Sequence, residues 1–351
     1  MAEAEGPLWR WQHSKVDVPA LRLEPVSFDR IAGWSADSHC AALECYLRTA
    51  CAAKLPVPEN ARLSLQDREK ARAFFEESFT PLRVMDGPGL LTAYFEPVLK
   101  GSRKRSEAFA VPVYRRPPDL RPLPPGHPLA ELGFTAAREA TGALAPYPAR
   151  AEIEAGALAG RGLEILFLSD SLEAFIMHVQ GSGLVELDDG TVARLTFDGK
   201  NGHPYTSVAK RLIERGRLAP EDAHLEGMTA WLRGRPDLQL WLNENKSYIF
   251  FRELEQTAAA PRGSSGAELH PGRSLAADPL YHAMGTPIWV VAPELTFEGA
   301  PFRRLLTVQD TGSAIRGPRR GDVFAGMGQD AGRVAGRIRH GCEFFVLRPR
   351  R

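Results

Sequence analysis

The sequence predicts a mainly β fold with peripheral helices. Near the start of the chain, residues 28–54 and 64–80 carry apolar residues at the three- and four-residue spacing of amphipathic helices. Most of the remaining chain consists of short strand-like runs bounded by Gly and Pro. Strands spread over the whole chain favour β-barrels over a parallel α/β sheet. A length of 351 residues suggests two domains, at roughly 150 residues each.

The elements follow in order from local patterns. Residue Ser64, with Asp67 three positions later, is a plausible start for the second helix. The Pro-rich residues 115–150 are predicted to be irregular. Strands are predicted over residues 89–97, 164–168, 183–187 and 191–197, the last two joined as a hairpin by the Asp-Asp-Gly turn at 188–190. Helices are predicted over residues 205–216 and 225–233, and short strands resume from residue 241.

Composition excludes several classes of partner. The chain has 44 Lys and Arg against 43 Asp and Glu, a net charge of +1, so no field of one sign would gather nucleic acid. The longest apolar runs, such as residues 287–292, are far shorter than the ~20 residues of a membrane helix. The first twelve residues lack the pattern of a secretory signal. The four cysteines are too few for a disulfide framework, and buried free thiols are expected.

The residues that carry chemistry are carboxylates in glycine-rich loops. The nine histidines form no HExxH motif and no paired CxxC motif occurs, so no metal and no cofactor are expected. No GxSxG nucleophile elbow and no phosphate-binding loop occur either. In residues 308–326, Asp310 and Asp322 lie beside small residues, where a bulky substrate could approach the backbone. The residues alone leave open that both aspartates only close turns.

This stretch resembles the C-terminal motif of the membrane-bound lytic murein transglycosylase A (MltA) family, in a barrel domain named after three aspartates. Asp278, Asp310 and Asp322 fit its three signature positions in order. Four upstream segments also resemble family motifs, and the resemblance covers about residues 80–350. These segments are Leu-Thr-Ala-Tyr-Phe-Glu-Pro at 91–97, His-Val-Gln-Gly-Ser-Gly at 178–183, Gly-Lys-Asn-Gly-His-Pro-Tyr at 199–205 and Asn-Lys-Ser-Tyr-Ile-Phe-Phe at 245–251. The departures are Ala93 for a usual Gly, Lys246 for a usual Pro, and no lipid-attachment Cys at the N-terminus.

The resemblance implies a double-psi β-barrel domain formed by residues 1–98 and 236–351, with a second β-barrel domain, residues 99–235, inserted into it. A groove between the two domains would hold the glycan. The implied activity is that of a peptidoglycan lytic exotransglycosylase, which cleaves the β-1,4 bond between N-acetylmuramic acid and N-acetylglucosamine without water and leaves 1,6-anhydromuramyl ends. A periplasmic protein is implied, with the full precursor associated with the outer membrane. Glycan strands are the expected partner of a monomer, and cell-wall synthase or divisome proteins are further candidates.

By resemblance, Asp322 is the single catalytic acid/base and Asp310 supports it, while Asp278 is expected to be structural. A protonated Asp322 needs a raised pKa, so Arg316, Arg319 and Arg320 are expected to point away from it. A further set of residues is expected to bind the sugar chain: Thr92, Tyr94, Gln180, Gly181, Ser182 and Asn201.

Two other functions remain open at this point. In a two-carboxylate glycoside hydrolase, Asp310 and Asp322 would flank the scissile bond together with a water molecule. In a cell-wall polysaccharide-binding module, the same barrel would hold the glycan without cutting it.

Overall fold

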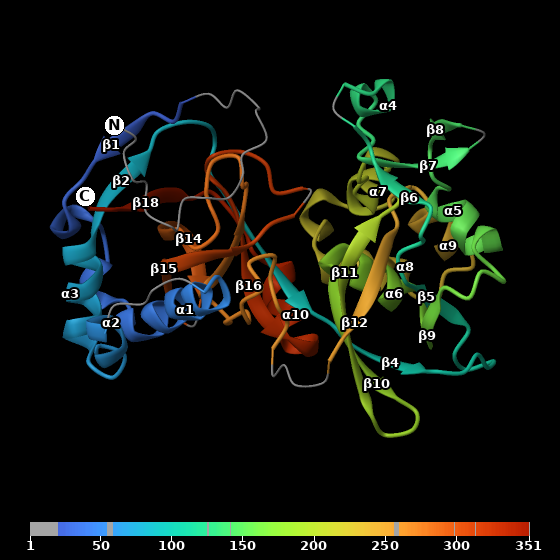
Figure 1. Cartoon of the computed structure of the whole chain (residues 1–351), viewed down its shortest axis with the longest axis horizontal. Coiled ribbons are helices and arrows are strands. Elements are labelled where there is room, and N and C mark those ends of the chain that lie inside the picture. The colour runs from blue at the N-terminus through green and yellow to red at the C-terminus, as the bar shows by residue number, and fades with distance from the viewer. Residues whose placement is uncertain are drawn as a thin grey trace. The chain divides into compact units, whose positions relative to one another are not determined.

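The computed structural model describes residues 20–54, 59–124, 126–140, 142–255, 260–297, 299–312 and 314–350, and the chain packs as two units (Figure 1). The first unit is Met1–Tyr94, Ala259–Gly326 and Ile338–Arg351, and the second is Phe95–Ala258 and Met327–Arg337. Residues 236–258 and 327–337 were predicted to belong to the domain that contains both ends of the chain. They pack in the second unit because strand β12 (Ile249–Leu254) pairs with β11 (Val192–Lys200), and helix α10 (Gly328–Gly336) contacts α8 (Leu225–Leu232).

The first unit is built on a nine-stranded sheet in the order β1-β2-β18-β14-β15-β13-β16-β3-β17. Its strands come from both ends of the chain. The N-terminal strands are β1 (Leu23–Pro25), β2 (Phe79–Val84) and β3 (Leu90–Glu96). The C-terminal strands are β13 (Ser274–Ala277), β14 (Pro287–Phe297), β15 (Ala300–Asp310), β16 (Arg320–Met327), β17 (Arg339–His340) and β18 (Glu343–Pro349). One face of this sheet buries an aliphatic core that includes Leu91, Leu275 and Val323.

Helices α1 (His39–Ala52), α2 (Glu59–Leu63) and α3 (Arg68–Ser78) belong to the same unit. α1 and α3 pack against each other and bury an aromatic core with Trp289 of β14 and Phe345 of β18. Two short 3-10 turns, Phe28–Arg30 and Trp34–Ala36, precede α1, which is therefore shorter than the predicted helix over 28–54. α3 begins after Asp67, whose side chain accepts from the backbone N–H groups of residues 69 and 70, and not at Ser64.

The second unit is built on a six-stranded sheet in the order β12-β11-β10-β4-β9-β5. A bridge between Arg115, next to β5, and Phe251 of β12 joins the two edges, so the sheet closes on itself. The strands not yet defined are β4 (Val98–Ser102), β5 (Val111–Tyr114), β9 (Glu164–Leu168) and β10 (Ser182–Leu187), together with a separate three-stranded sheet of β6 (Leu120–Pro122), β7 (Ala136–Ala140) and β8 (Ala143–Ala145).

The helices of the second unit are mostly short. They are α4 (Pro128–Glu131), α5 (Arg150–Glu152), α6 (Ser171–Gln180), α7 (Val208–Glu214), α8, α9 (Leu238–Leu242) and α10, with a π-helical turn at Ile153–Ala157 and a 3-10 turn at Pro220–Asp222. α6, α7, α8 and α9 share an apolar cluster that includes Phe175, Leu212 and Leu232. The fold is therefore mainly β with peripheral helices, as predicted.

Most predicted elements of the second unit are present, within a few residues. β9 coincides with the predicted strand 164–168, β10 and β11 form the predicted hairpin, and α7 and α8 lie within the predicted helices. The other helices of this unit, α4, α5, α6, α9 and α10, were not predicted. The Pro-rich residues 115–150, predicted to be irregular, contain β6, β7 and β8. These strands are three to five residues long, too short for an alternating pattern to stand out.

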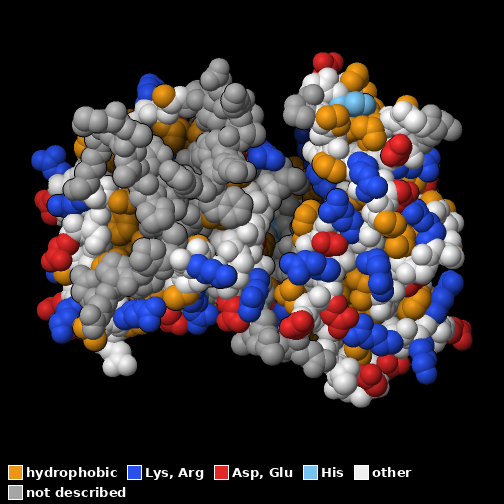
Figure 2. Space-filling model, viewed as in Figure 1, with side chains coloured by type: hydrophobic (Ala, Val, Ile, Leu, Met, Phe, Trp, Pro, Cys, Tyr) orange, Lys and Arg blue, Asp and Glu red, His pale blue; other side chains and the backbone are white. Residues whose placement is uncertain are grey.

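No helix in the described part of the chain is long and apolar enough to cross a membrane. On the visible face of the second unit, at the right of Figure 2, Lys and Arg side chains are interspersed with Asp and Glu. This agrees with the net charge of +1 and gives that face no extended patch of one sign.

Candidate active site

The two aspartates of the C-terminal motif lie on one face of the first unit's sheet. Strand β13 runs between β15 and β16, and its Ala276 is the register partner of both Asp310 and Asp322. Directly paired residues of neighbouring strands project to the same face of a sheet. With neighbouring strands ~4.8 Å apart, the Cα atoms of the two aspartates lie roughly 10 Å apart across the sheet, on either side of Ala276.

Strand β3, on the other side of β16, adds two hydroxyl groups to this face. Thr92 and Tyr94 are two residues apart on β3, so their side chains project to the same side. The Thr92 hydroxyl donates to Oδ1 of Asp322. The Tyr94 hydroxyl donates to Oδ2 of Asp310 at 3.1 Å. Each aspartate is therefore held by one residue of β3, a role that differs from the sugar contacts predicted for Thr92 and Tyr94.

Asp322 is a partly buried carboxyl with a raised pKa. Burial is the largest influence and raises the pKa, and the neighbouring charge of Asp310 raises it further. The hydrogen bond from Thr92 and the positive charge of Arg320 act in the opposite direction but do not cancel the effect of burial. Oδ2 of Asp322 accepts no hydrogen bond from any residue that the structure describes. The group can thus keep a proton at higher pH than a free aspartate and has one oxygen available to transfer it.

Asp310 differs from Asp322 in how completely its oxygens are bonded. Oδ1 accepts from the backbone N–H of Ser264 at 3.0 Å, from the Ser264 hydroxyl at 2.7 Å and from the Thr311 N–H at 2.9 Å, while Oδ2 accepts from Tyr94. Burial raises the pKa of Asp310, against the hydrogen bonds from Ser264, Thr311 and Tyr94, which lower it. These bonds tie Asp310 to the loop at 264 and to β3 and use both of its oxygens, in contrast to Asp322.

Asp278, the third aspartate of the motif, organises the loop that leads into β16. It is 1% exposed, and its Oδ2 accepts from the Gly317 N–H at 2.8 Å. Its Oδ1 accepts from the Leu280 N–H at 3.1 Å and lies 3.5 Å from Nη1 of Arg316. Nε2 of His282 holds the next residue of that loop through the Pro318 carbonyl at 2.7 Å. This geometry supports the structural role predicted for Asp278.

The three arginines near Asp322 in sequence do not behave alike. Arg316 pairs with Asp278, and Arg319 donates to the carbonyl of Gly87, so both are engaged elsewhere. Arg320 does not point away from Asp322, contrary to the prediction. Its Nη2 donates to the Thr92 hydroxyl at 2.8 Å, and its charge lowers the pKa of Asp322. Residues two apart on a strand share a face, so the spacing of Arg320 and Asp322 carried a signal for this contact.

The glycine between these two residues is required by packing. A Cβ at Gly321 would lie 2.8 Å from the ring of Phe344 and 2.9 Å from Leu275. Gly321 points to the aliphatic core on the opposite face from Asp322, where no other side chain fits. Ser264 was missed as a partner of Asp310 because it is 46 residues away in a small-residue segment without a distinctive pattern.

The second unit carries the predicted Gln-Gly-Ser segment at the end of α6. Oε1 of Gln180 accepts from the Phe95 N–H at 3.0 Å, while its amide nitrogen donates to no residue in the described ranges. Gly181 ends the helix in a left-handed conformation, φ +81°, and a Cβ there would meet nothing within 4 Å. Ser182 begins β10 and is partly exposed. The backbone around Gly181 is thus open to a ligand.

Asn201, predicted to bind the sugar chain, lies instead in the core of the second unit. It is 0% exposed, and its amide nitrogen donates to the carbonyls of Pro148 and Lys246, both at 2.9 Å. Its Oδ1 accepts from the Tyr248 N–H at 2.9 Å. With these three bonds, the amide has no group left for a ligand, and we leave Asn201 out of the proposed site.

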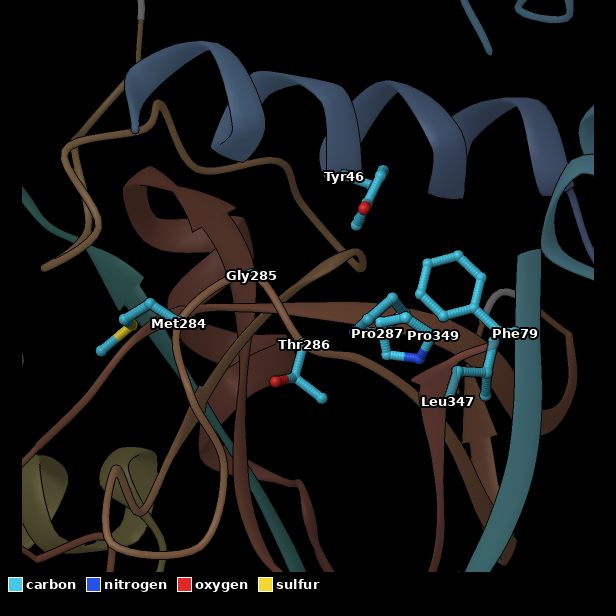
Figure 3. Close-up of a pocket in the computed structure, with 8 residues that line it drawn as sticks. All are labelled: Tyr46, Phe79, Met284, Gly285, Thr286, Pro287, Leu347 and Pro349. Atoms are coloured by element: carbon cyan, nitrogen blue, oxygen red, sulfur yellow. The ribbon is translucent and has the colours of Figure 1, made fainter. Parts of the chain in front are cut away.

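A cavity of about 10 Å³ lies in the first unit beside Tyr46 and Phe79 (Figure 3). Such a volume holds one water molecule at most, so it is a packing gap and not a sugar site.

The described residues contain no group of three or more His, Cys, Asp or Glu side chains placed to hold a metal ion.

Comparisons with known proteins identify the family of this chain. Residues 90–252 match the model of the MltA specific insert domain, and residues 273–348 match that of the 3D domain. A crystal structure of the membrane-bound lytic murein transglycosylase from Agrobacterium tumefaciens is 32% identical, covers 93% of this chain and 97% of its own, and superposes with a TM-score of 0.80. The chain belongs to the MltA family.

Two further relatives of this family are informative. The membrane-bound lytic murein transglycosylase A of Vibrio cholerae is 37% identical over 262 residues, or 72% of this chain, and the match spans 64% of the Vibrio protein's length. The structure of Escherichia coli MltA with bound chitohexaose is 26% identical, covers 96% of this chain and 94% of its own, and has a TM-score of 0.67. The family's solved structures therefore include one with a β-linked sugar chain bound.

Proposed function

We propose that this protein is a lytic transglycosylase that cleaves the β-1,4 bond between N-acetylmuramic acid and N-acetylglucosamine in peptidoglycan. The observation that carries the proposal is that the site holds one free carboxyl group. Asp322 has a raised pKa and an unbonded Oδ2, whereas Asp310 is bonded through both oxygens. A glycosidase that uses water needs two working carboxylates, and a transglycosylase needs one.

The chemistry follows from that single group. Protonated Asp322 donates its proton to the glycosidic oxygen, and the bond between that oxygen and the anomeric carbon breaks. The 6-hydroxyl of the same muramyl residue attacks the anomeric carbon and gives its proton to the Asp322 carboxylate. This closes the 1,6-anhydro ring and returns Asp322 to its acid form. The tethered hydroxyl gains the high effective molarity of an intramolecular nucleophile, so no bound water is required.

The membership of the family and the sugar chain bound by the E. coli relative support a glycan substrate. We place Gln180 and the backbone at Gly181 and Ser182 among the sugar-binding groups, because they offer an unpaired amide and an open turn. The names of the relatives as membrane-bound murein enzymes support a periplasmic location.

Mass spectrometry of peptidoglycan fragments tests the reaction type. Released muropeptides should carry anhydro ends, about one water lighter than reducing ends, and Asp322→Asn should release them about 10²–10⁴-fold more slowly. Reducing ends would identify a hydrolase instead, and glycan binding without any release would identify a binding module.

The pH dependence of the rate tests the single acid. Because burial raises the pKa of Asp322, its acid form should persist to mildly acidic pH and then disappear as the pH rises. The rate should therefore fall on the alkaline side. A rate that stays flat into the alkaline range, with flat substrate binding, would contradict acid catalysis by Asp322.

A further inference from the structure

Arg320, Thr92 and Asp322 form one chain of hydrogen bonds on the face of the first unit's sheet. Nη2 of Arg320 donates to the Thr92 hydroxyl oxygen at 2.8 Å, and that hydroxyl contacts Oδ1 of Asp322. Nη1 of Arg320 donates to the carbonyl of Gly321, which fixes the guanidinium against its own strand. Arg320, Thr92 and Asp322 are each only partly exposed, so this arrangement is partly shielded from solvent.

The donors available decide the direction of the two hydrogen bonds that link Arg320, Thr92 and Asp322. A guanidinium carries only donors, so the Thr92 oxygen must accept from Arg320. If Thr92 also accepted a proton from Asp322, its own hydrogen would have no acceptor among the described residues. When Thr92 donates to Oδ1, its hydrogen has an acceptor and its oxygen still accepts from Arg320. A partly buried hydroxyl hydrogen left unpaired would cost free energy, which favours the paired arrangement.

We propose that Arg320 is a positioning residue that acts through Thr92 to hold Oδ1 of Asp322 as a hydrogen-bond acceptor, so that the transferable proton is carried on Oδ2. This inference rests on the proposed function, in which Asp322 is the acid and base. Oδ2 gives its proton to the glycosidic oxygen as the bond between that oxygen and the anomeric carbon breaks. Oδ2 then takes the proton of the 6-hydroxyl. Oδ1 stays an acceptor throughout, so Thr92 does not need to reorient between the two steps.

The charged and titratable groups around Asp322 come from four strands. Arg320 lies on β16 itself, Asp310 at the end of β15, Tyr94 on β3 and Arg339 on β17, opposite Thr92. Cys342, which follows β17, influences Arg320. Burial raises the pKa values of both Tyr94 and Cys342, so both stay neutral where the enzyme works. Arg320 is therefore the positive group that directly favours the charged form of Asp322.

The test is the pH profile of kcat/KM for muropeptide release by Arg320→Met. Arg320 lowers the pKa of Asp322, so its loss should move the alkaline limb of the profile to higher pH. The rate on the acidic plateau should fall by less than the ~10²-fold or more expected when a general acid is removed. Arg320→Lys keeps the charge and a donor and should return the limb toward that of the wild type.

Two further variants separate this role from a general structural one. Arg319 is the neighbouring residue, and its side chain donates to the carbonyl of Gly87. Arg319→Met therefore removes the same charge at a different place and should leave the alkaline limb of the pH profile unmoved. Thr92→Val removes the middle of the chain and should also move the limb upward, since the Thr92 hydrogen bond lowers the pKa of Asp322. The double variant Thr92→Val with Arg320→Met should shift the limb by less than the sum of the two single shifts.

An unmoved limb in Arg320→Met, or fully additive shifts in the double variant, would overturn the inference. If Asp322→Asn is inactive in the same assay, the proposed function stands even so. If Asp322→Asn is active, the proposed function fails first. Circular dichroism checks that each variant is folded, and Arg320→Gln replaces Arg320→Met if the latter is not, because it also removes the charge.

Discussion

The polar motif residues of the two units are bonded in different ways. In the first unit, Asp322 keeps one carboxylate oxygen without a hydrogen-bond partner among the described residues. In the second unit, Asn201 gives every amide group to the backbone, and the buried Arg150 donates to the carbonyls of Asn245 and Ser247. Asp322 and Asn201 lie in motif segments that look equally specific in the sequence. A polar motif residue is available for chemistry only where some of its atoms remain unpaired.

The two aspartates should give the largest contrast in activity. Asp322→Asn should lower muropeptide release by about 10²–10⁴-fold, the usual contribution of a general acid. Its stability should not fall, because burial already disfavours the charged form that the substitution removes. Asp310→Asn should lose less activity and keep the alkaline limb of the pH profile. If both variants lost activity equally and both lost the alkaline limb, the two-carboxylate hydrolase would again be the better interpretation.

Asn201→Leu should give the largest change in stability. The substitution leaves the Pro148 carbonyl and the Tyr248 N–H without partners in the core, while the Lys246 carbonyl keeps the Arg150 N–H. At about 1–3 kcal/mol for each of these two buried unpaired groups, the free energy of unfolding should fall by about 2–6 kcal/mol, measured by urea unfolding of the full chain. Asn243→Leu is a matched control, since Asn243 is partly exposed and bonds the Gln239 side chain. A stable Asn201→Leu with weakened glycan binding would return Asn201 to the binding site.

Glu96 should make the stability of the chain depend on pH. It is 0% exposed in the second unit, and burial raises its pKa from 4.5 to about 7, although the Arg194 charge at 3.3 Å lowers it. The neutral form is favoured in the folded state. Its contribution is therefore complete below pH 4.5 and is lost as the pH rises through about 7, in total about 3 kcal/mol.

Urea unfolding of wild type and Glu96→Gln at several pH values measures this effect. In Glu96→Gln, the free energy of unfolding should decline much less between pH 4.5 and 7 than in the wild type. Glu186→Gln, at an exposed position on β10, should show the same decline as the wild type. Identical pH profiles in wild type and Glu96→Gln would show that Glu96 is not the group responsible.

Gln180→Ala should have the smallest effect, a weaker binding of the sugar chain. Its free amide nitrogen is proposed to bind the sugar chain, and removing one hydrogen bond to a ligand costs about 1–3 kcal/mol if the partner is left unpaired. Chito-oligosaccharide affinity, measured by calorimetry in the inactive Asp322→Asn background, should fall by that amount. Val179→Ala, at an exposed neighbouring position, serves as the control. Unchanged affinity would make Gln180 a purely structural cap for the Phe95 N–H.

The sequence by itself determined much of the local structure and the family. Strand 164–168, the hairpin around 188–190 and the helix over 225–233 follow from patterns within a dozen residues. The helix over 171–180 could have been found too, since Asp170 caps it and Gly181 ends it. The ordered motifs were enough to name the family and both aspartates. Local pattern could not fix the bounds of the two units, because β12 joins the second unit through pairing with β11.

Only the tertiary structure decided which polar groups are free. Thr92 and Asp322 are 230 residues apart, and their contact exists because β3 lies beside β16 in the sheet. The same pairing brings Arg320 onto Thr92, and burial in that sheet raises the pKa of Asp322. Asn201 and Gln180 look alike as motif amides, yet the packing of the second unit encloses the first and leaves the second partly open. Hydrogen-bond satisfaction and desolvation depend on neighbours that are distant in the chain, so no local pattern specifies them.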